Sequence, residues 1–146
     1  MSLTNAAETA ILQLLFENAN WANIGDATGL RGSTTAGSWH VSLHTADPGE
    51  AGNQTTSEIS YTGYARVAVA RSTAGWTVSG ASVTPDAAIT FGAMTGGAGG
   101  TVTHFGIGTD ASGTGNLIFK GTVTPNIVVT SGVTPQLTTA TAVTAD

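Results

Sequence analysis

The sequence predicts a mainly β fold, namely an antiparallel, jelly-roll-like β-sandwich preceded by one N-terminal amphipathic α-helix. From residue 38 onward, short segments rich in β-branched and aromatic residues recur at intervals of roughly 8–12 residues, with Gly, Pro and Asp turns between them. Apolar residues at helical spacing occur only near the start of the chain. Because no helical segment separates the strands, a βαβ fold is excluded.

The length of the chain limits the number of domains it can form. With 146 residues it has the size of one domain with a substantial core. We therefore expect a single domain over residues 1–146, made of a helix at 5–19, a loop at 20–37 and the β-sandwich at 38–146.

The first element is the helix at residues 5–19. Asn5 and Glu8 have the spacing of a capping box at its start. Its apolar residues recur at i, i+4, i+7 and i+8, and two more widen this face; they are Ala7, Ile11, Leu14 and Leu15, with Leu12 and Phe16 beside them. The wide face fits a helix packed over the open end of a sheet, and it also fits a helix docked on a neighbouring subunit.

The loop at residues 20–37 is longer than most connections, and Trp21, Ile24 and Leu30 are expected to pin it to the body of the protein. If the helix and this loop touch another subunit, the candidate assembly contacts are their large apolar side chains, which are Ile11, Leu12, Leu15, Phe16 and Trp21.

The first strand, at residues 38–45, has the clearest pattern: Trp39, Val41 and Leu43 alternate with polar residues, as in a strand with one buried face. Asp47-Pro48-Gly49 then ends it, since proline presets φ and glycine accepts positive φ. Further strands are expected at 63–70, 76–78, 82–84, 88–91, 102–109, 116–122, 127–129 and 136–143. The expected core residues are Trp39, Val41, Leu43, Tyr64, Phe91, Phe105, Ile107, Leu117 and Phe119.

Two short segments carry expectations of their own. In the segment 63–66, Tyr64 is expected to bury its ring and place its hydroxyl on a partner, and Arg66 to pair with a carboxylate or to cap carbonyl groups. In the segment 101–107, Gly106 indicates a bulge or a close backbone approach.

The chain carries little charge. Charged residues make up 9% of it, against about a quarter in an ordinary soluble domain, and the net charge is −5. Such a surface favours a protein covered by copies of itself or by partners. The four cations form no cluster, so nucleic-acid binding is not expected. With no run of about 18 apolar residues, no transmembrane helix is expected, and the N-terminus lacks the basic region of a secretory signal.

No catalytic signature is found. The absence of cysteine excludes thiolate nucleophiles, thiolate metal sites and disulfides. His40 and His44 lie about 13 Å apart along one strand face, too far to hold one ion, whereas His104 can approach either through strand pairing. A histidine metal site is thus the alternative to the structural hydrogen-bonding role that we favour. We expect no enzymatic activity and no cofactor.

Six short motifs run in order along nearly the whole chain: an alanine-rich helix at 6–16, His44-Thr-Ala-Asp-Pro-Gly49, Gly63-Tyr-Ala-Arg66, Ile89-Thr-Phe91, Thr101-Val-Thr-His-Phe-Gly-Ile107 and Gly115-Asn-Leu-Ile118. This ordered set resembles a family of small tailed-bacteriophage virion proteins, usually labelled phage tail fibre or minor tail proteins. The resemblance implies a structural protein without catalytic residues, assembled in the bacterial host cytoplasm. It also implies contacts with other copies of the chain and with neighbouring virion proteins, such as a tail or major capsid protein.

Two other functions stay open. A capsid decoration (cement) protein, which stabilises a phage head, fits the same acidic, weakly charged β-sandwich with an N-terminal helix. A carbohydrate-binding module, which would recognise a glycan receptor, needs exposed aromatic side chains, and Trp76 and Tyr61 lie in segments that are expected to be exposed.

Overall fold

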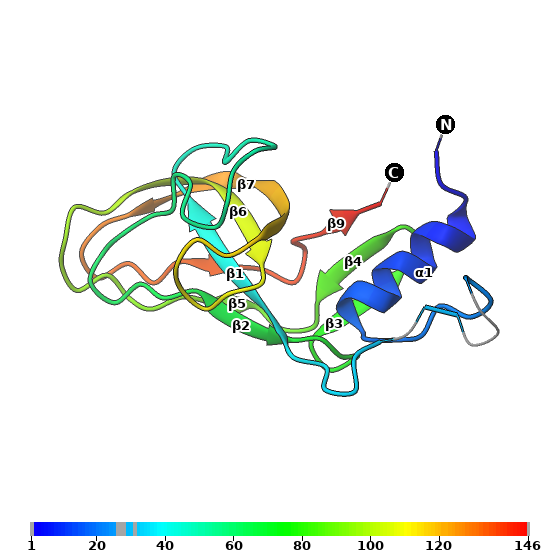
Figure 1. Cartoon of the computed structure of the whole chain (residues 1–146). Helices are drawn as coiled ribbons and strands as arrows, with labels where there is room; N and C mark the ends of the chain where they lie inside the picture. Colours follow the sequence, from blue (N-terminus) through cyan, green and yellow to red (C-terminus); the bar gives the residue numbers. More distant parts are fainter. Residues whose placement is uncertain (1, 26–28, 31, 146) are drawn as a thin grey trace. The chain divides into compact units, whose positions relative to one another are not determined.

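The computed structural model describes residues 2–25, 29–30 and 32–145 and divides the chain into two compact units (Figure 1). The helical unit comprises Met1–Ser38, Val69–Ala88 and Thr138–Asp146, and the sheet unit comprises Trp39–Ala68 and Ile89–Leu137. The expected single domain of residues 1–146 stays a prediction. Residues 26–28 and 31 of the expected 20–37 loop lie outside the described residues.

The fold class is confirmed: the described chain is mainly β, with antiparallel sheets and one N-terminal helix. The four-stranded sheet has the order β2-β1-β6-β7. Its strands are β1 (Ser38–His44), β2 (Val67–Ala70), β6 (Gly100–Gly108) and β7 (Leu117–Val129). A two-stranded sheet joins β5 (Ile89–Thr90) to β8 (Gln136–Leu137). The jelly-roll-like arrangement stays a prediction.

Strand boundaries differ from the expected ones at three places. The segment 63–66 is not part of a strand, because the Tyr64 amide donates to the Tyr61 carbonyl in a turn (3.1 Å). The segments 116–122 and 127–129 belong to one strand, β7, which continues through a register shift opposite Val102 and His104. The segment 136–143 is broken by a turn at residues 138–141 into β8 and β9 (Val143–Thr144).

The core of the sheet unit contains most of the expected residues. Six of the nine are buried, namely Trp39, Val41, Leu43, Phe91, Phe105 and Ile107. Leu117 and Phe119 are only half-buried, because β7 is an edge strand of its sheet. Tyr64 is half-buried as well, and its ring stacks on Phe91 with centroids 6.1 Å apart.

The helical unit packs α1 (Asn5–Phe16) on the sheet β3-β4-β9. The strands β3 (Trp76–Ser79) and β4 (Ser82–Pro85) form a hairpin, and β9 pairs with β4. Leu12 and Phe16 are fully buried, and the Phe16 ring meets Trp76 edge-on with centroids 4.8 Å apart. This result corresponds to the first of the two helix alternatives, a helix that covers a sheet.

The ends of α1 differ from the expectation. The N-cap is Thr4, whose hydroxyl oxygen accepts from the Ala7 amide at 3.4 Å, so the capping box expected from Asn5 is wrong. The helix ends at Phe16 rather than at residue 19, with Glu17 as its C-cap and Asn18 at a φ of 58°. The Arg71 guanidinium donates to the carbonyls of Leu14 (2.9 Å) and Leu15 (2.7 Å), and a cation there satisfies helix-end carbonyls and opposes the helix dipole.

The following loop is held by polar groups. The backbones of Trp21 and Leu30 form two hydrogen bonds of 2.8 and 2.9 Å. The Asn18 side chain donates to the Ser33 carbonyl and accepts from the Ser33 amide. Leu30 and Ile24 are exposed, so the expectation that they anchor the loop by packing is wrong. The described part of the chain holds no helix that is long and apolar enough to cross a membrane.

Leu12→Ala should lower the free energy of unfolding of the helical unit by about 2–5 kcal/mol, because it leaves a cavity in a closed core. Leu14→Ala is the matched control, since Leu14 lies on the same helix but is only half-buried. Urea unfolding followed by circular dichroism measures both. Equal losses for the two variants would contradict the assigned packing face of α1.

Candidate functional site

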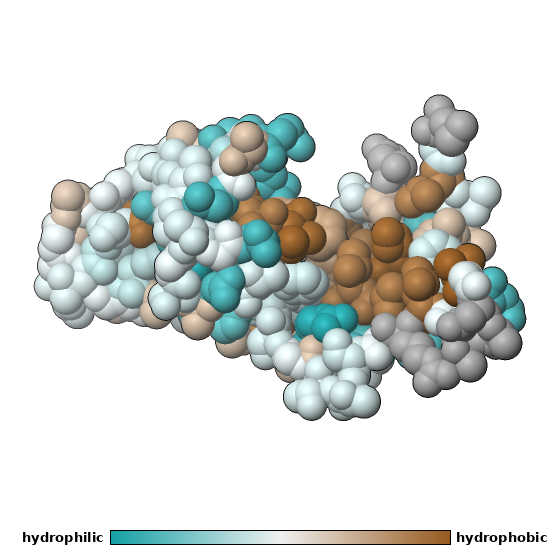
Figure 2. All heavy atoms as spheres, in the orientation of Figure 1, coloured by the Kyte–Doolittle hydropathy of each residue, from teal (hydrophilic) through white to brown (hydrophobic). Residues whose placement is uncertain are grey.

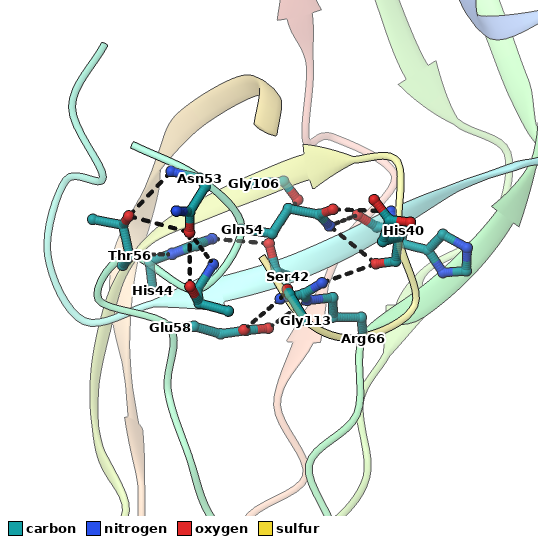
Figure 3. A network of polar contacts seen from close by, with 12 residues as sticks. His40, Ser42, His44, Asn53, Gln54, Thr56, Glu58, Arg66, Gly106 and Gly113 are labelled. Carbon is teal, nitrogen blue, oxygen red and sulfur yellow. Dashed lines mark hydrogen bonds and ion pairs between the residues drawn. The ribbon is translucent and has the colours of Figure 1, made fainter. Parts of the chain in front are cut away.

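A network of polar side chains joins two long loops to the end of β1 in the sheet unit (Figure 3). The loops span residues 47–58 and 109–116. We refer to these side chains as the polar network: Ser42, His44, Gln54, Glu58, Tyr64 and Arg66.

Arg66 forms the centre of the polar network. Its Nε and Nη2 donate to the two carboxylate oxygens of Glu58, each at 2.7 Å, in a bidentate ion pair. Its Nη1 and Nη2 also donate to the carbonyls of Asp110 (2.9 Å) and Gly113 (2.7 Å). The Arg66 side chain is only 3% exposed. The hydrogen bonds to Glu58 raise the pKa of Arg66, so the charge is kept. Arg66 therefore does both things expected of it: it pairs with a carboxylate and it caps carbonyls.

Tyr64 links this ion pair to β1. Its hydroxyl donates to Glu58 Oε1 (2.9 Å) and accepts from the Leu43 amide (3.0 Å). Burial is the main reason why the pKa of Tyr64 is raised, and the hydroxyl stays protonated. The expectation that this hydroxyl finds a partner is confirmed.

His44 fixes the loop 47–58 from the other side. Its Nδ1 lies 2.8 Å from the Thr56 carbonyl and its Nε2 lies 2.8 Å from the Ser42 hydroxyl. Because a carbonyl only accepts, Nδ1 carries the hydrogen and Nε2 accepts from Ser42. His44 is fully buried, and burial lowers its pKa. The imidazole is therefore neutral at pH 7.

Gln54 is the least expected member of the polar network. It is fully buried although it belongs to a loop. Its Oε1 accepts from the Asp110 amide (2.9 Å) and its Nε2 donates to the Asp110 carbonyl (3.2 Å), while its own amide donates to the Thr114 carbonyl (2.9 Å). These bonds hold the two loops together at a point that Arg66 also contacts.

The Ser42–His44 pair has the geometry of a nucleophile and its general base. Both residues are fully buried, and the backbone of Gly106 lies directly against them. A Cβ at Gly106 would lie 2.7 Å from His44 Nε2 and 2.8 Å from Ser42 Oγ. The expected close backbone approach at Gly106 is confirmed. The pair has no room beside it for a substrate, and its geometry fits a structural role.

The other two histidines do not join this pair in a metal centre. His104 is the register partner of His44 on β6, and its Nδ1 lies 2.9 Å from the Thr103 hydroxyl. His40 is half-buried. No group of three metal-ligating side chains is found among residues 2–25, 29–30 and 32–145.

A surface pocket of about 220 Å³ lies beside the start of β7, lined by residues 49, 50, 52 and 117–120. Lys120 Nζ at its rim pairs with Asp47 (3.0 Å) and Glu50 (3.2 Å). The hydrogen bond to Asp47 is the main cause of the raised pKa of Lys120. The single Lys120 ammonium is thus shared between two carboxylates at this rim.

The candidate assembly residues fall into two groups. Leu12 and Phe16 are fully buried within the helical unit, so they are unable to contact another subunit without unfolding it. Ile11, Leu15 and Trp21 are half-buried. Their part in assembly stays a prediction.

The aromatic platform of a carbohydrate-binding module is not found in the described part of the chain. Trp76 is 2% exposed because α1 covers it, and Tyr61 is 7% exposed with its hydroxyl bonded to the Gly92 carbonyl (2.8 Å). The expectation that these two rings are exposed is wrong.

Sequence reasoning missed Gln54 and the Ser42–His44 pair. A serine and a histidine two apart on a strand lie on the same face, so this pair could have been found from the alternation. Gln54 stands in a polar stretch, Gly52-Asn-Gln-Thr-Thr56, and no local signal distinguishes it from its neighbours.

Comparison with known families gives a match over nearly the whole chain. A family model described as "Podophage GP4 fiber I protein gp80" matches residues 2–145. The chain therefore belongs to this family, and it is a podophage tail fibre protein, a structural component of the virion. A search of curated proteins finds no match.

Gly106→Ala should destabilise the sheet unit by about 1–3 kcal/mol, because the new methyl group would displace His44 and Ser42. Gly96→Ala is the matched control, since its nearest contact is Thr62 Oγ1 at an ordinary 3.4 Å. Thermal unfolding measures both variants. A Gly106→Ala variant as stable as Gly96→Ala would contradict the close packing.

Arg66→Met should cost about 3 kcal/mol, because it leaves the Glu58 carboxylate, only 14% exposed, without its cation. It should also speed amide hydrogen exchange at residues 110–114, which lose their anchor. Lys120→Met removes an exposed pair and should cost much less. Hydrogen exchange followed by mass spectrometry measures the exchange rate of residues 110–114 in both variants. Unchanged exchange in this loop would show that Arg66 does not hold it.

Stability should fall as the pH drops below 6.5, the ordinary value for the histidine pKa. His44 has a lowered pKa in the folded state, so between that value and 6.5 the unfolded chain binds more protons and stability rises with pH. One histidine contributes at most about 1.4 kcal/mol per pH unit. Urea unfolding between pH 5 and 8 measures the slope. His44→Gln, whose side chain does not titrate, should reduce the slope of stability against pH. An unchanged slope would show that a group other than His44 causes the pH dependence.

Proposed function

From its membership of this fibre family, we propose that the chain is a non-enzymatic structural part of the tail fibre and that each particle carries several copies. The match over residues 2–145 is the observation that carries this proposal. We also propose that it assembles in the host cytoplasm and contacts copies of itself and neighbouring tail proteins.

The polar network supports a structural role in which two loops keep one conformation. Arg66 and Gln54 hold the loop 109–116 from within the fold, and His44 and Tyr64 hold the loop 47–58 and its partner strand. Buried, fully paired groups of this kind lock one conformation. The burial of Ser42 and His44 favours the same non-enzymatic role.

The low charge supports multicopy assembly. Only 9% of residues are charged, and three of the four cations, Arg66, Arg71 and Lys120, bind groups of their own chain. The remaining surface can meet another subunit without desolvating many charges. Neither capsid decoration nor glycan binding is favoured by a specific observation.

Quantitative mass spectrometry of purified particles should find this chain in several copies per tail. Particles grown without it should lack a fibre density in electron micrographs, and complementation with the chain should restore that density. A single copy per particle would contradict multicopy assembly. Particles that lose head stability while keeping their fibres would favour capsid decoration.

A further inference from the structure

The outer side of β7 is an unpaired strand edge. β7 is the last strand of the four-stranded sheet and has 13 residues, whereas β2 at the opposite edge has four. Among the described residues, no segment pairs with β7 on the side away from β6. Such an edge presents backbone N–H and C=O groups that can pair with a strand of another chain.

The hydrogen bonds of β1 show in which direction the backbone groups of β6 point. The Leu43 amide donates to the Tyr64 hydroxyl, and the Leu43 carbonyl accepts from the Ile59 amide. Leu43 therefore does not bond to β6. Backbone groups of successive residues alternate in direction along an antiparallel strand. Phe105, which lies opposite Leu43 in register, thus directs its N–H and C=O groups toward β7.

On β7 the same alternation places two residues at the outer edge. Phe105 lies opposite Gly121, so the backbone groups of Gly121 bond to β6. Lys120 and Thr122, on either side of Gly121, then point their N–H and C=O groups away from the sheet. Further along the strand, Pro125 has no N–H group to donate. The edge that is free to accept a strand is therefore the first half of β7.

The pocket of about 220 Å³ lies beside this part of the edge. It is lined by residues 117–120 of β7 and by residues 49, 50 and 52 of the loop 47–58. Small-molecule sites usually have about 300–1,000 Å³, so this smaller pocket suits one side chain of an added strand. In strand addition, backbone hydrogen bonds supply affinity, and pockets beside the edge select the side chains.

The charges at the pocket indicate the chemistry of the partner. One cation, Lys120, pairs there with two carboxylates, Asp47 and Glu50, which leaves a net charge of −1. The Glu50 side chain is 95% exposed, so a second cation can reach it. Figure 2 shows strongly hydrophilic residues gathered over the loop 47–58 at the top of the sheet unit, whereas most of the visible surface of this unit is pale. These features favour a basic partner.

A second copy of the chain fits this edge poorly. Its β7 would bring another Lys120 to the strand pair, and like charges on paired strands are destabilising. Each copy also carries a net charge of −5, so two copies repel each other.

We propose that the outer edge of β7 binds an extended, basic segment of a neighbouring virion protein, which adds a strand beside Lys120 and Thr122. One side chain of the segment enters the pocket, and a lysine or arginine of the segment pairs with Glu50. In the choice of a virion protein as partner, this inference rests on the proposed contacts with neighbouring tail proteins.

Peptide binding followed by NMR tests the site on the full-length chain. The probe is the peptide Lys-Val-Lys-Val-Lys, and its counterpart carries glutamate in place of each lysine. The lysine peptide should shift the amide signals of Lys120 and Thr122 with a Kd of about 1 mM, and the glutamate peptide should bind at least about tenfold more weakly. Equal binding of the two peptides, or no shift at these amides up to about 10 mM, overturns the proposal.

A methylated peptide separates strand addition from attraction between charges. The lysine peptide with an N-methyl group on every residue keeps its charges and loses its backbone donors, so it should bind at least about tenfold more weakly than the parent. Binding as tight as that of the parent peptide overturns strand addition. Shifts of the Lys120 and Thr122 amides on concentrating the chain alone would assign the edge to a second copy and also overturn the proposal.

Variants of the chain test the same contacts from the other side. Glu50→Gln should weaken binding of the lysine peptide at least about threefold, and Glu8→Gln, which removes the same charge in the helical unit, should not. Thr122→Pro removes an outward N–H group, and Thr122→Val keeps it. Peptide binding should be lost in the first and kept in the second, with melting temperatures as the check on folding. Equal binding by the two Thr122 variants, or by the two glutamate variants, contradicts the assigned contacts.

Particles test the choice of partner. Particles complemented with Thr122→Pro should contain at least about tenfold less of the chain than particles complemented with Thr122→Val. Equal incorporation overturns a virion protein as the partner. The peptide experiments need no particle, so a failure of the edge site is distinguishable from a failure of the proposed fibre function.

Discussion

The geometry of one end of the sheet unit depends on the burial of a single cation. A guanidinium removed from water is tolerated only when its donors are bonded and its charge is paired. Arg66 uses four of its five N–H donors on Glu58, Asp110 and Gly113. Two loops and the segment before β2 must therefore converge on one point. The orientation of Tyr64 follows from this, and through the Leu43 amide so does the edge of β1.

The glycines around the polar network are a consequence of the same constraint. A side chain at Gly106 would enter the space of His44 and Ser42, and side chains at Gly108 and Gly115 would both collide with Gln54. Gly115 also has a positive φ of 47°, which side chains disfavour. The buried polar side chains thus occupy space that is free because the neighbouring positions are glycines without side chains. Part of the high glycine content, 20 residues in all, is explained in this way.

The sequence predicted those features that depend on residues close together in the chain. Strand β1, the burial of Trp39 and Leu43 and the two roles of Arg66 follow from alternation and from the needs of a cation beside a carboxylate. Other features depend on contacts distant in sequence. Trp76 is buried only because Phe16 packs on it, Phe119 is half-buried because its strand lies at an edge, and Gln54 is enclosed by a loop about 56 residues further on. The N-cap was misplaced by one residue because threonine and asparagine are both good caps.

The distribution of charge bears on how this fibre protein meets its neighbours. The Arg66 and Arg71 guanidinium groups donate hydrogen bonds to carbonyls and a carboxylate inside the units. Lys120 forms ion pairs with Asp47 and Glu50. In the described part of the chain, no lysine or arginine remains to bind an acidic partner. Ionic attraction to a partner therefore has to come from the carboxylates, since the sequence holds nine of them against four cations.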